Sequence, residues 1–260
     1  MARGLALLVG LKSVDPTAYG GDGAAGSEGC EHDVDNMVKV VSSAGKYEIN
    51  TLKTKQATAS AILAGIGSAA RTLKSGDLFV FYYSGHGGRK KDTSGDEADK
   101  YDETLVAYDK EILDDELAKL WLEFAPGVRI VMLSDSCNSG TNCDLIATRT
   151  IQKTKPRRTI KKVRKLIKFA GKVPGMKAQL IHFGACKDGQ ASASFGQGGA
   201  FTLALREIWD SGKFSGTYRQ FYNAIKARLI KAQLPNLQEP QFNFIGKIQP
   251  AFRNSKPFSL

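Results

Sequence analysis

The sequence contains no long hydrophobic run and few cysteines or histidines, and each absence excludes a class of protein. No apolar stretch approaches the roughly 18 residues that a helix needs to cross a bilayer, so no membrane span is expected. Four cysteines, scattered along the chain, are too few for a disulfide scaffold and fit a reducing compartment. Three histidines and no Cys-x-x-Cys pair argue against a structural zinc site. These absences favour a cytoplasmic protein.

A nucleotide cofactor is not expected either. The first predicted strand runs from Leu5 to Val9 and is followed by a loop rich in Gly, Ser, Asp and Pro. That loop lacks the Gly-x-Gly-x-x-Gly pattern of dinucleotide-binding folds. No organic cofactor is implied by any other part of the sequence.

Positive charge is concentrated in one segment. The chain has a formal net charge of +11 at pH 7, and the segment from Arg149 to Lys177 holds twelve basic residues and no acidic one. The rest of the chain is therefore close to neutral. We expect a nearly neutral globule with one basic insertion, which needs an explanation of its own.

Two apolar runs end in polar motifs. The run 78–83 ends at a Ser-Gly-His-Gly motif that contains His86, and the run 128–134 ends at an Asp-Ser-Cys-Asn motif that contains Cys137. Such runs are typical of strands buried on both faces, and we expect a tight loop after each. Because the carboxyl ends of parallel strands form one edge of a sheet, where reacting groups collect, His86 and Cys137 are predicted to meet there.

Strand and helix patterns alternate along the chain. This alternation predicts an α/β fold with a central, mainly parallel sheet of about six strands and helices on both faces. Helices are predicted over 31–44, 60–73, 114–124, 200–209 and 218–234, and further strands over 47–53, 179–184 and 241–245.

A cysteine and a histidine delivered to one sheet edge form a nucleophile and its base. Taken alone, Cys137 is more often a small buried hydrophobe, and His86 could equally be structural. The polar neighbours of Cys137 and the glycines on both sides of His86 favour the catalytic interpretation, because glycine lets a backbone approach closely. His32 and His182 are expected to be structural.

Several motifs follow one another along the chain: Gly29-Cys30 with Asp33 and Met37, Tyr83-Ser84-Gly85-His86-Gly87, the segments 95–104 and 114–117, Asp135 to Gly140, the segment 184–192, and Glu239-Pro240-Gln241. This set resembles the caspase-like clan, and within it the metacaspases and their prokaryotic relatives. The resemblance covers essentially the whole chain in the family's order. The cysteine motif departs from the Gln-Ala-Cys-x-Gly of aspartate-directed caspases, so aspartate specificity is not expected.

The resemblance implies a cysteine endopeptidase with a caspase-like fold. The thiolate of Cys137 would attack the peptide carbonyl, and His86 would accept the thiol proton and later protonate the leaving amine. By analogy, the backbone N–H groups of Cys137 and Gly87 would hold the oxyanion. The chain is then a single peptidase domain over 1–260: a half over 1–148 with the dyad, a basic linker over 149–177, and a half over 178–260 that resembles the small subunit.

The predicted substrates carry Arg or Lys before the cleaved bond. A buried cation must be paired with a carboxylate. Asp135 lies two residues before the nucleophile, and Asp33 lies at the start of the first helix. In metacaspases, the residues that match Cys30, Asp33, Ser84 and Asp135 form such a pocket. The alternative is that Asp33 merely favours the start of its helix.

The acidic residues between 92 and 115 have two interpretations. Runs of charge are usually solvated loops. Alternatively, the resemblance implies that Asp102, Asp114, Asp115 and Asp144 bind Ca²⁺, as the matching residues do in calcium-activated metacaspases. Carboxylate oxygens suit this hard cation.

The basic segment is also open to several interpretations. Clustered Lys and Arg attract the phosphates of nucleic acids or membranes, although Phe169 is the only aromatic residue available for stacking, so nucleic acid is not an expected partner. In caspase-like proteases this junction is cut during maturation, and a protease that prefers basic residues would cleave itself here. Helical spacing of apolar residues between 163 and 170 could instead indicate an ordered basic helix.

Together these patterns predict a monomeric, calcium-stimulated and self-processing cysteine endopeptidase that acts on proteins or peptides. One alternative is a non-catalytic caspase-like scaffold whose basic segment binds an anionic partner. Another is a protease of the same fold with a different residue preference. The presence of both His86 and Cys137 weighs against the scaffold, because a pseudoenzyme would be free to lose either.

Overall fold

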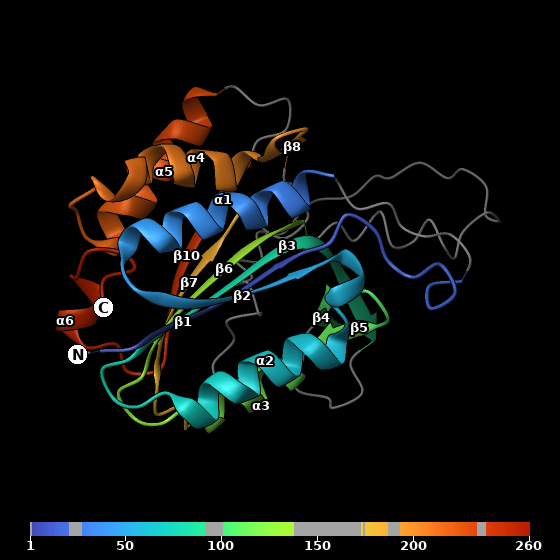
Figure 1. The fold of residues 1–260 in the computed structure, drawn as a ribbon, viewed down its shortest axis with the longest axis horizontal. Helices are drawn as coiled ribbons and strands as arrows, with labels where there is room; N and C mark the ends of the chain where they lie inside the picture. Colours follow the sequence, from blue (N-terminus) through green and yellow to red (C-terminus); the bar gives the residue numbers. More distant parts are fainter. Residues whose placement is uncertain are drawn as a thin grey trace, which may run out of the picture.

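The computed structural model describes residues 2–20, 28–91, 101–137, 173, 175–186, 193–232 and 238–260. Its centre is a sheet with the strand order β10-β7-β6-β3-β1-β2, which Figure 1 shows between two layers of helices. These strands are β1 (Gly4–Gly10), β2 (Tyr47–Lys53), β3 (Leu78–Lys91), β6 (Arg129–Cys137), β7 (Gln179–Gly184) and β10 (Gln241–Ile245).

Five neighbouring strands of the sheet are parallel. The parallel pairs are β2 with β1, β1 with β3, β3 with β6 and β6 with β7, whereas the edge strand β10 runs antiparallel to β7. Two short strands, β4 (Tyr101–Val106) and β5 (Glu111–Leu113), extend the sheet from the far end of β3. The predicted mainly parallel α/β fold is confirmed.

Helices cover both faces of this sheet (Figure 1). One layer contains α1 (Gly29–Ala44), α4 (Ala200–Trp209) and α5 (Tyr218–Lys231), with the short α6 (Pro250–Arg253) at the end of the chain. The other layer contains α2 (Ala59–Thr72) and α3 (Asp114–Glu123). Between β7 and α4 lies a small hairpin of β8 (Ser194–Phe195) and β9 (Gly198–Gly199).

The alternation of side chains along β3 divides the interior into two cores. Phe79, Phe81 and Tyr83 belong to the core beneath α2 and α3, whereas Val80 and Tyr82 belong to the core beneath α1, α4 and α5. All five are at most 1% exposed. Full burial of one large apolar side chain stabilises a fold by about 1.5–3 kcal/mol, so both faces of β3 contribute to stability.

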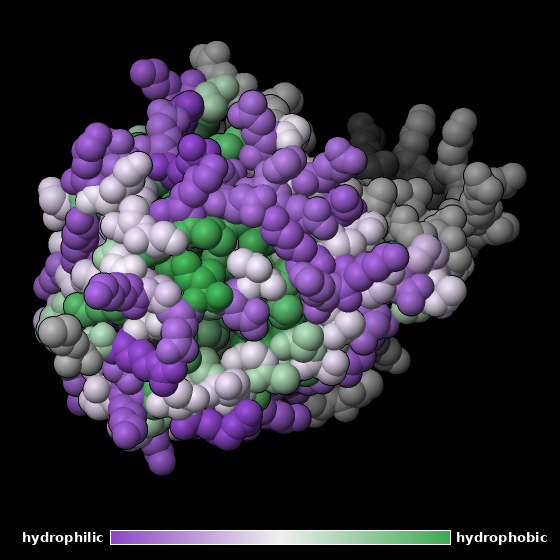
Figure 2. Space-filling view, viewed as in Figure 1, coloured by the Kyte–Doolittle hydropathy of each residue, from purple (hydrophilic) through white to green (hydrophobic). Residues whose placement is uncertain are grey.

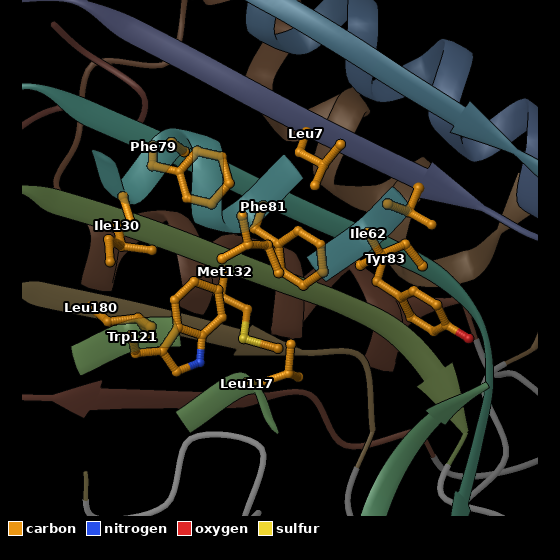
Figure 3. Packing of buried hydrophobic residues seen from close by; sticks show 14 of the residues in the cluster. Leu7, Ile62, Phe79, Phe81, Tyr83, Leu117, Trp121, Ile130, Met132 and Leu180 are labelled. Atoms are coloured by element: carbon orange, nitrogen blue, oxygen red, sulfur yellow. The ribbon is translucent and has the colours of Figure 1, made fainter. Parts of the chain in front are cut away.

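Figure 3 shows the core beneath α2 and α3. The rings of Phe79 and Phe124 stack with their centroids 5.6 Å apart, and the ring of Trp121 lies 6.0 Å from that of Phe81. Tyr83 stands at the end of this row, and its hydroxyl points toward the bend of β3 (Figure 3). The core therefore reaches the edge of the sheet at which His86 lies.

The predicted tight loops after the two apolar runs are wrong. β3 continues through His86 to Lys91, and β6 continues to Cys137. The backbone N–H and C=O groups of these polar residues pair with neighbouring strands, because β3 pairs with β6 up to His86 and with β4 from Gly87 onward. This pairing, first with β6 and then with β4, overrides the loop preference of the glycines.

The interpretation of the acidic stretch as a solvated loop is wrong for its second part. Residues 101–106 form β4, in which Glu103 is 1% exposed and Thr104 is fully buried. Residues 92–100 lie outside the described residues, as does the predicted basic linker except for 173 and 175–177.

Both termini lie at the end of the sheet opposite His86 (Figure 1), where Gly4 is close to the side chain of Leu260. The face drawn in Figure 2 is mainly hydrophilic, with one hydrophobic area over α1 and the neighbouring strand β2. Among the described helices, none combines the length and the hydropathy that a bilayer span requires.

Candidate functional site

The strand register brings the two predicted catalytic residues to neighbouring positions. In the parallel ladder of β3 and β6, Tyr83 is paired with Ser134, Ser84 with Asp135, and His86 with Cys137 as the last pair. Neighbouring strands in a sheet lie about 4.8 Å apart, so the two backbones are adjacent at the carboxyl edge. His86 is half-buried. The side chain of Cys137 lies outside the described residues, and the catalytic roles stay a prediction.

Tyr83 ties the main chain at His86 to the neighbouring strand. Its hydroxyl lies 2.7 Å from the carbonyl oxygen of His86 and 2.8 Å from that of Val106 in β4. A β-carbon on Gly85 would lie 2.6 Å from this hydroxyl, so only glycine leaves room for the contact. The Tyr-Ser-Gly-His motif therefore fixes the backbone that carries His86.

Gly87 is buried and paired in register with Leu105 of β4. Its predicted role is to offer its N–H group to an oxyanion next to Cys137. The register of β3 keeps Gly87 directly after the last pair with β6.

Two buried carboxyls, Asp33 and Asp135, lie close to each other on the face of the sheet covered by α1 and α4. Asp33 is 1% exposed and Asp135 is 5% exposed. The hydroxyl of Ser84 donates to Asp33 Oδ2 at 2.8 Å, and Ser84 is the register partner of Asp135. Three of the four residues predicted for the pocket are thus brought together. The fourth, Cys30, is buried one helical turn before Asp33 on α1.

Burial and the neighbouring carboxylate change the protonation of this pair. Desolvation, followed by repulsion from Asp135, raises the pKa of Asp33 to about 8. Hydrogen bonds from Ser84 and from the Gly199 amide oppose this shift but do not cancel it. The site therefore favours one negative charge over two, and a bound cation would lower the cost of the second charge.

The alternative that Asp33 only favours the start of its helix is not supported by its contacts. α1 begins at Gly29 after Glu28, and Asp33 lies in its second turn. The Asp33 carboxyl instead reaches across to Ser84 in β3 and to Gly199 in β9.

Three groups around these carboxyls were not predicted from the sequence. Thr202 donates to Asp135 Oδ2 from both its amide (3.2 Å) and its hydroxyl (2.7 Å). The hydroxyl of Tyr82 lies 2.6 Å from that of Thr202. β-carbons on Gly198 and Gly199 would come within 2.3 Å of Asp33 Oδ1 and Asp135 Oδ2, respectively. The paired glycines before a predicted helix were the one local signal of such a close approach.

The predicted calcium ligands are only partly described. Asp114 and Asp115 form the first turn of α3, and the Asp115 amide donates to Asp114 Oδ1 at 3.0 Å. The backbone of Asp102 lies in β4, whereas its side chain and all of Asp144 lie outside the described residues. Within the described part of the chain, no group of three or more His, Cys, Asp or Glu side chains could hold a metal ion.

The remaining buried histidine and cysteine have structural contacts. His182 in β7 is fully buried with its Nε2 3.1 Å from the Ser134 hydroxyl, and burial lowers its pKa to about 4. The thiol of Cys186 donates to the carbonyl oxygen of Ser136 at 3.3 Å.

Comparisons with solved structures place this architecture in a known class. Caspase-1 from Spodoptera frugiperda superposes with a TM-score of 0.63 at 14% identity, over 94% of this chain and 91% of that one. The fold is therefore caspase-like. A protein from Geobacter sulfurreducens of known crystal structure superposes with a TM-score of 0.79 at 35% identity, over 99% of both chains.

Sequence comparisons define the family. The family model described as "Metacaspase, peptidase C14 domain" matches residues 5–146. The chain belongs to this metacaspase family of cysteine peptidases. Metacaspase-1 from Botryotinia fuckeliana is 34% identical over 131 residues, 45% of this chain and 31% of that protein. Metacaspase-1 from Mycosarcoma maydis is 46% identical over 80 residues, 29% of this chain and 20% of that protein. The match thus spans about a third or less of these curated relatives.

Proposed function

We propose that this protein is a cysteine endopeptidase in which Cys137 is the nucleophile and His86 is its general base. The observation that carries the proposal is the register of β3 and β6, in which these two residues are the last pair at the carboxyl edge of the sheet. Membership of the metacaspase family supports it.

In the proposed reaction, the Cys137 thiol gives its proton to His86, and the thiolate attacks the substrate carbonyl carbon. The oxyanion accepts hydrogen bonds from the N–H groups of Cys137 and Gly87. His86 then protonates the leaving amine, and the amide C–N bond breaks to leave a thioester on Cys137. A water molecule that gives a proton to His86 hydrolyses this thioester and restores the thiol.

The proposed substrates carry Arg or Lys before the cleaved bond. Asp33 and Asp135 are buried close to each other, Asp135 lies two positions before Cys137 in β6, and these buried carboxyls favour an incoming cation. Arg would form the stronger pair because its guanidinium offers parallel N–H donors to a carboxylate.

A panel of fluorogenic peptides tests activity and specificity together. The peptides carry Arg, Lys, citrulline or Asp before the cleaved bond, and citrulline is the neutral analogue of Arg. We expect cleavage of the Arg and Lys peptides only. Cys137→Ala and His86→Ala should abolish it, and Asp135→Ala should lower kcat/KM for Arg by about a hundredfold or more.

Asp35→Asn is the matched control for loss of a carboxylate. Asp35 lies on the same helix as Asp33 but is exposed and paired with Lys53 at 2.7 Å. This variant should retain the activity of the parent. Full activity of Asp135→Ala on Arg peptides would contradict the pocket assignment, and preferred cleavage of the Asp peptide would indicate a different residue preference.

We also propose that Ca²⁺ stimulates the enzyme and that Asp114 and Asp115 belong to its site. Two adjacent carboxylates are suitable hard ligands. Since the described residues contain no complete set, the site also requires Asp102 and Asp144. Titration of activity with Ca²⁺ against EGTA, and calorimetric binding to parent and Asp114→Asn protein, test this directly. Activity that is unchanged by EGTA would contradict it.

Self-processing within 149–177 is the third part of the proposal. The segment offers twelve basic residues to a protease of this preference. Mass spectrometry of the purified chain after incubation with Ca²⁺ should show cuts after Arg or Lys in this segment, and none in Cys137→Ala protein. An intact parent chain would argue against processing.

We further propose a cytoplasmic monomer, which sedimentation of the full chain can test. The scaffold alternative predicts no turnover and tight binding of an anionic partner by the basic segment. Retention of the chain on heparin together with inactivity toward every peptide of the panel would favour that alternative.

A further inference from the structure

The two carboxyls of the proposed specificity pocket are held in different ways. Asp135 Oδ2 accepts two hydrogen bonds from Thr202, one from the amide at 3.2 Å and one from the hydroxyl at 2.7 Å. Thr202 is fully buried in the first turn of α4, where the helix N-terminus favours negative charge. These contacts favour the ionised form of the Asp135 carboxyl.

The hydroxyl groups of Tyr82 and Thr202 form a chain of hydrogen bonds in which each hydroxyl donates toward Asp135. Burial, followed by the two neighbouring carboxyls, raises the pKa of Tyr82, so its hydroxyl keeps its proton. Since the Thr202 hydroxyl donates to Asp135, its oxygen is the acceptor for Tyr82, 2.6 Å away. The chain runs from Tyr82 through Thr202 to Asp135 and reinforces the negative charge at its end.

Asp33 is held by a different pair of donors. The Gly199 amide donates to its Oδ1 at 2.8 Å, and Oδ2 lies 2.8 Å from the Ser84 hydroxyl. Burial and the neighbouring Asp135 carboxyl nevertheless raise the pKa of Asp33 to about 8 against these two hydrogen bonds. Two buried carboxyls so close together favour one negative charge over two.

We propose that Thr202 and Tyr82 are positioning residues for the specificity pocket, which hold Asp135 as its permanent anion and leave Asp33 to carry a proton until a cation binds. The inference rests on the proposed preference for Arg or Lys. When the substrate cation enters, the Asp33 proton passes to solvent and the pocket gains a second negative charge. Thr202 and Tyr82 touch neither the substrate nor the dyad and act through Asp135.

Two further titratable or charged groups lie near the pair. Tyr82 comes from β3, and burial together with the two carboxyls raises its pKa. Arg206 comes from α4 and donates to Asn36 Oδ1 at 2.9 Å, three residues after Asp33.

Kinetics of Thr202 variants test the positioning role. Thr202→Val removes the hydroxyl at nearly constant volume, and Thr202→Ser restores it. We expect Thr202→Val to lower kcat/KM for an Arg peptide by about tenfold, mainly through KM, with little change for a citrulline peptide. Thr202→Ser should recover most of the loss. Thr104→Val is the matched control, because Thr104 is also fully buried but its hydroxyl has no hydrogen-bond partner among the described residues.

An equal loss for Arg and citrulline peptides, or no loss at all, would overturn the inference. A second measurement needs no turnover: carboxyl ¹³C chemical shifts of Cys137→Ala protein, assigned with Asp33→Asn and Asp135→Asn, are followed with pH. We expect Asp33 to titrate near 8, and the proposal requires Asp135 to be the ionised member of the pair at neutral pH. A proton on Asp135 instead would contradict the inference. If no Arg peptide is cleaved, the proposed function fails, and the titration still decides this question.

Discussion

At the scale of single residues, the burial of Asp33 makes the stability of the fold depend on pH. The folded protein binds a proton at Asp33 up to a pKa of about 8, whereas the ordinary value is 3.8. Between these values the unfolded chain has released the proton and the folded chain has not. The contribution of Asp33 to stability is therefore greatest below pH 3.8 and is lost as the pH rises toward 8.

Asp33→Asn removes this dependence because the amide is neutral at every pH. We expect the variant to gain stability over the parent between pH 5 and pH 8 by about 2–4 kcal/mol. Urea unfolding at both pH values measures the difference. If the free energies of unfolding of parent and variant change in parallel with pH, Asp33 is not the group that holds the proton.

His182 has the opposite pH dependence. Burial lowers its pKa to about 4 from an ordinary 6.5, so its neutral form stabilises the fold above pH 6.5, and this contribution is lost as the pH falls toward 4. We expect the parent to lose about 2 kcal/mol more than His182→Gln between pH 7 and pH 5. Thermal or urea unfolding at the two pH values tests this, and equal losses would assign the acid sensitivity to other groups.

The sequence motifs singled out the carboxyls of the proposed pocket but not the residues that donate hydrogen bonds to them. Asp33, Ser84 and Asp135 stand in motifs next to predicted strands or helices. Thr202 and Tyr82 do not, because their contacts join residues 67 and 120 positions apart. A threonine in a helix and a tyrosine in an apolar run give no local sign of such partners.

At the scale of elements, the end of β3 is the feature on which the dyad depends. The strand stays extended through Gly85, His86 and Gly87 because β6 pairs on one side and β4 then takes over. The Tyr83 hydroxyl holds the carbonyl oxygens of His86 and Val106 together at this change of partner.

Tyr83→Phe should therefore lower kcat by about tenfold, since the backbone of His86 loses a buried hydrogen bond. Its effect on KM should be small, because Tyr83 faces the other core. Tyr47→Phe is the control: its hydroxyl also donates to a carbonyl, that of Phe258 at 2.7 Å, at the opposite end of the sheet. Steady-state kinetics compare the two, and equal kcat values for both variants would contradict the role of Tyr83.

In the β8–β9 hairpin, the backbone of β9 lies against the two carboxyls of the proposed pocket. A β-carbon on Gly199 would lie 2.3 Å from Asp135 Oδ2, whereas one on Gly196 in the same hairpin would meet nothing within 4 Å. Gly199→Ala is expected to reduce cleavage of Arg peptides by about a hundredfold by displacing the carboxylate, and Gly196→Ala to leave it unchanged. Assays of the two variants side by side decide the point. An active Gly199→Ala enzyme would show that the hairpin moves freely away from Asp135.

Strands were predicted correctly where they are long and buried, and were missed where they are short or rich in acidic residues. The apolar runs of β1, β3, β6 and β7 identified the parallel sheet. β8 and β9 contain two residues each and have no periodicity to detect. β4 was hidden by its acidic residues, because burial of Glu103 against the sheet is a tertiary effect.

At the scale of the whole molecule, the candidate site joins both halves of the chain. His86, Cys137, Asp33 and Asp135 lie within residues 5–146, the part that the metacaspase family model matches. Gly199 and Thr202 lie beyond it and reach the carboxyls through the N-terminus of α4. The parallel topology explains the arrangement, since it carries the ends of β3 and β6 to one edge and packs α1 and α4 on the same face.

Covalent labelling of the whole chain shows whether Cys137 is a thiolate nucleophile activated by His86. The protein is incubated with a peptidyl chloromethyl ketone that ends in Arg, which alkylates the thiolate of a cysteine peptidase beside its histidine, and the modified residue is located by peptide mass spectrometry. We expect one label on Cys137, lost in His86→Ala and much reduced in Asp135→Ala. A label on Cys30 or Cys186 instead, or one that persists without His86, would contradict this expectation.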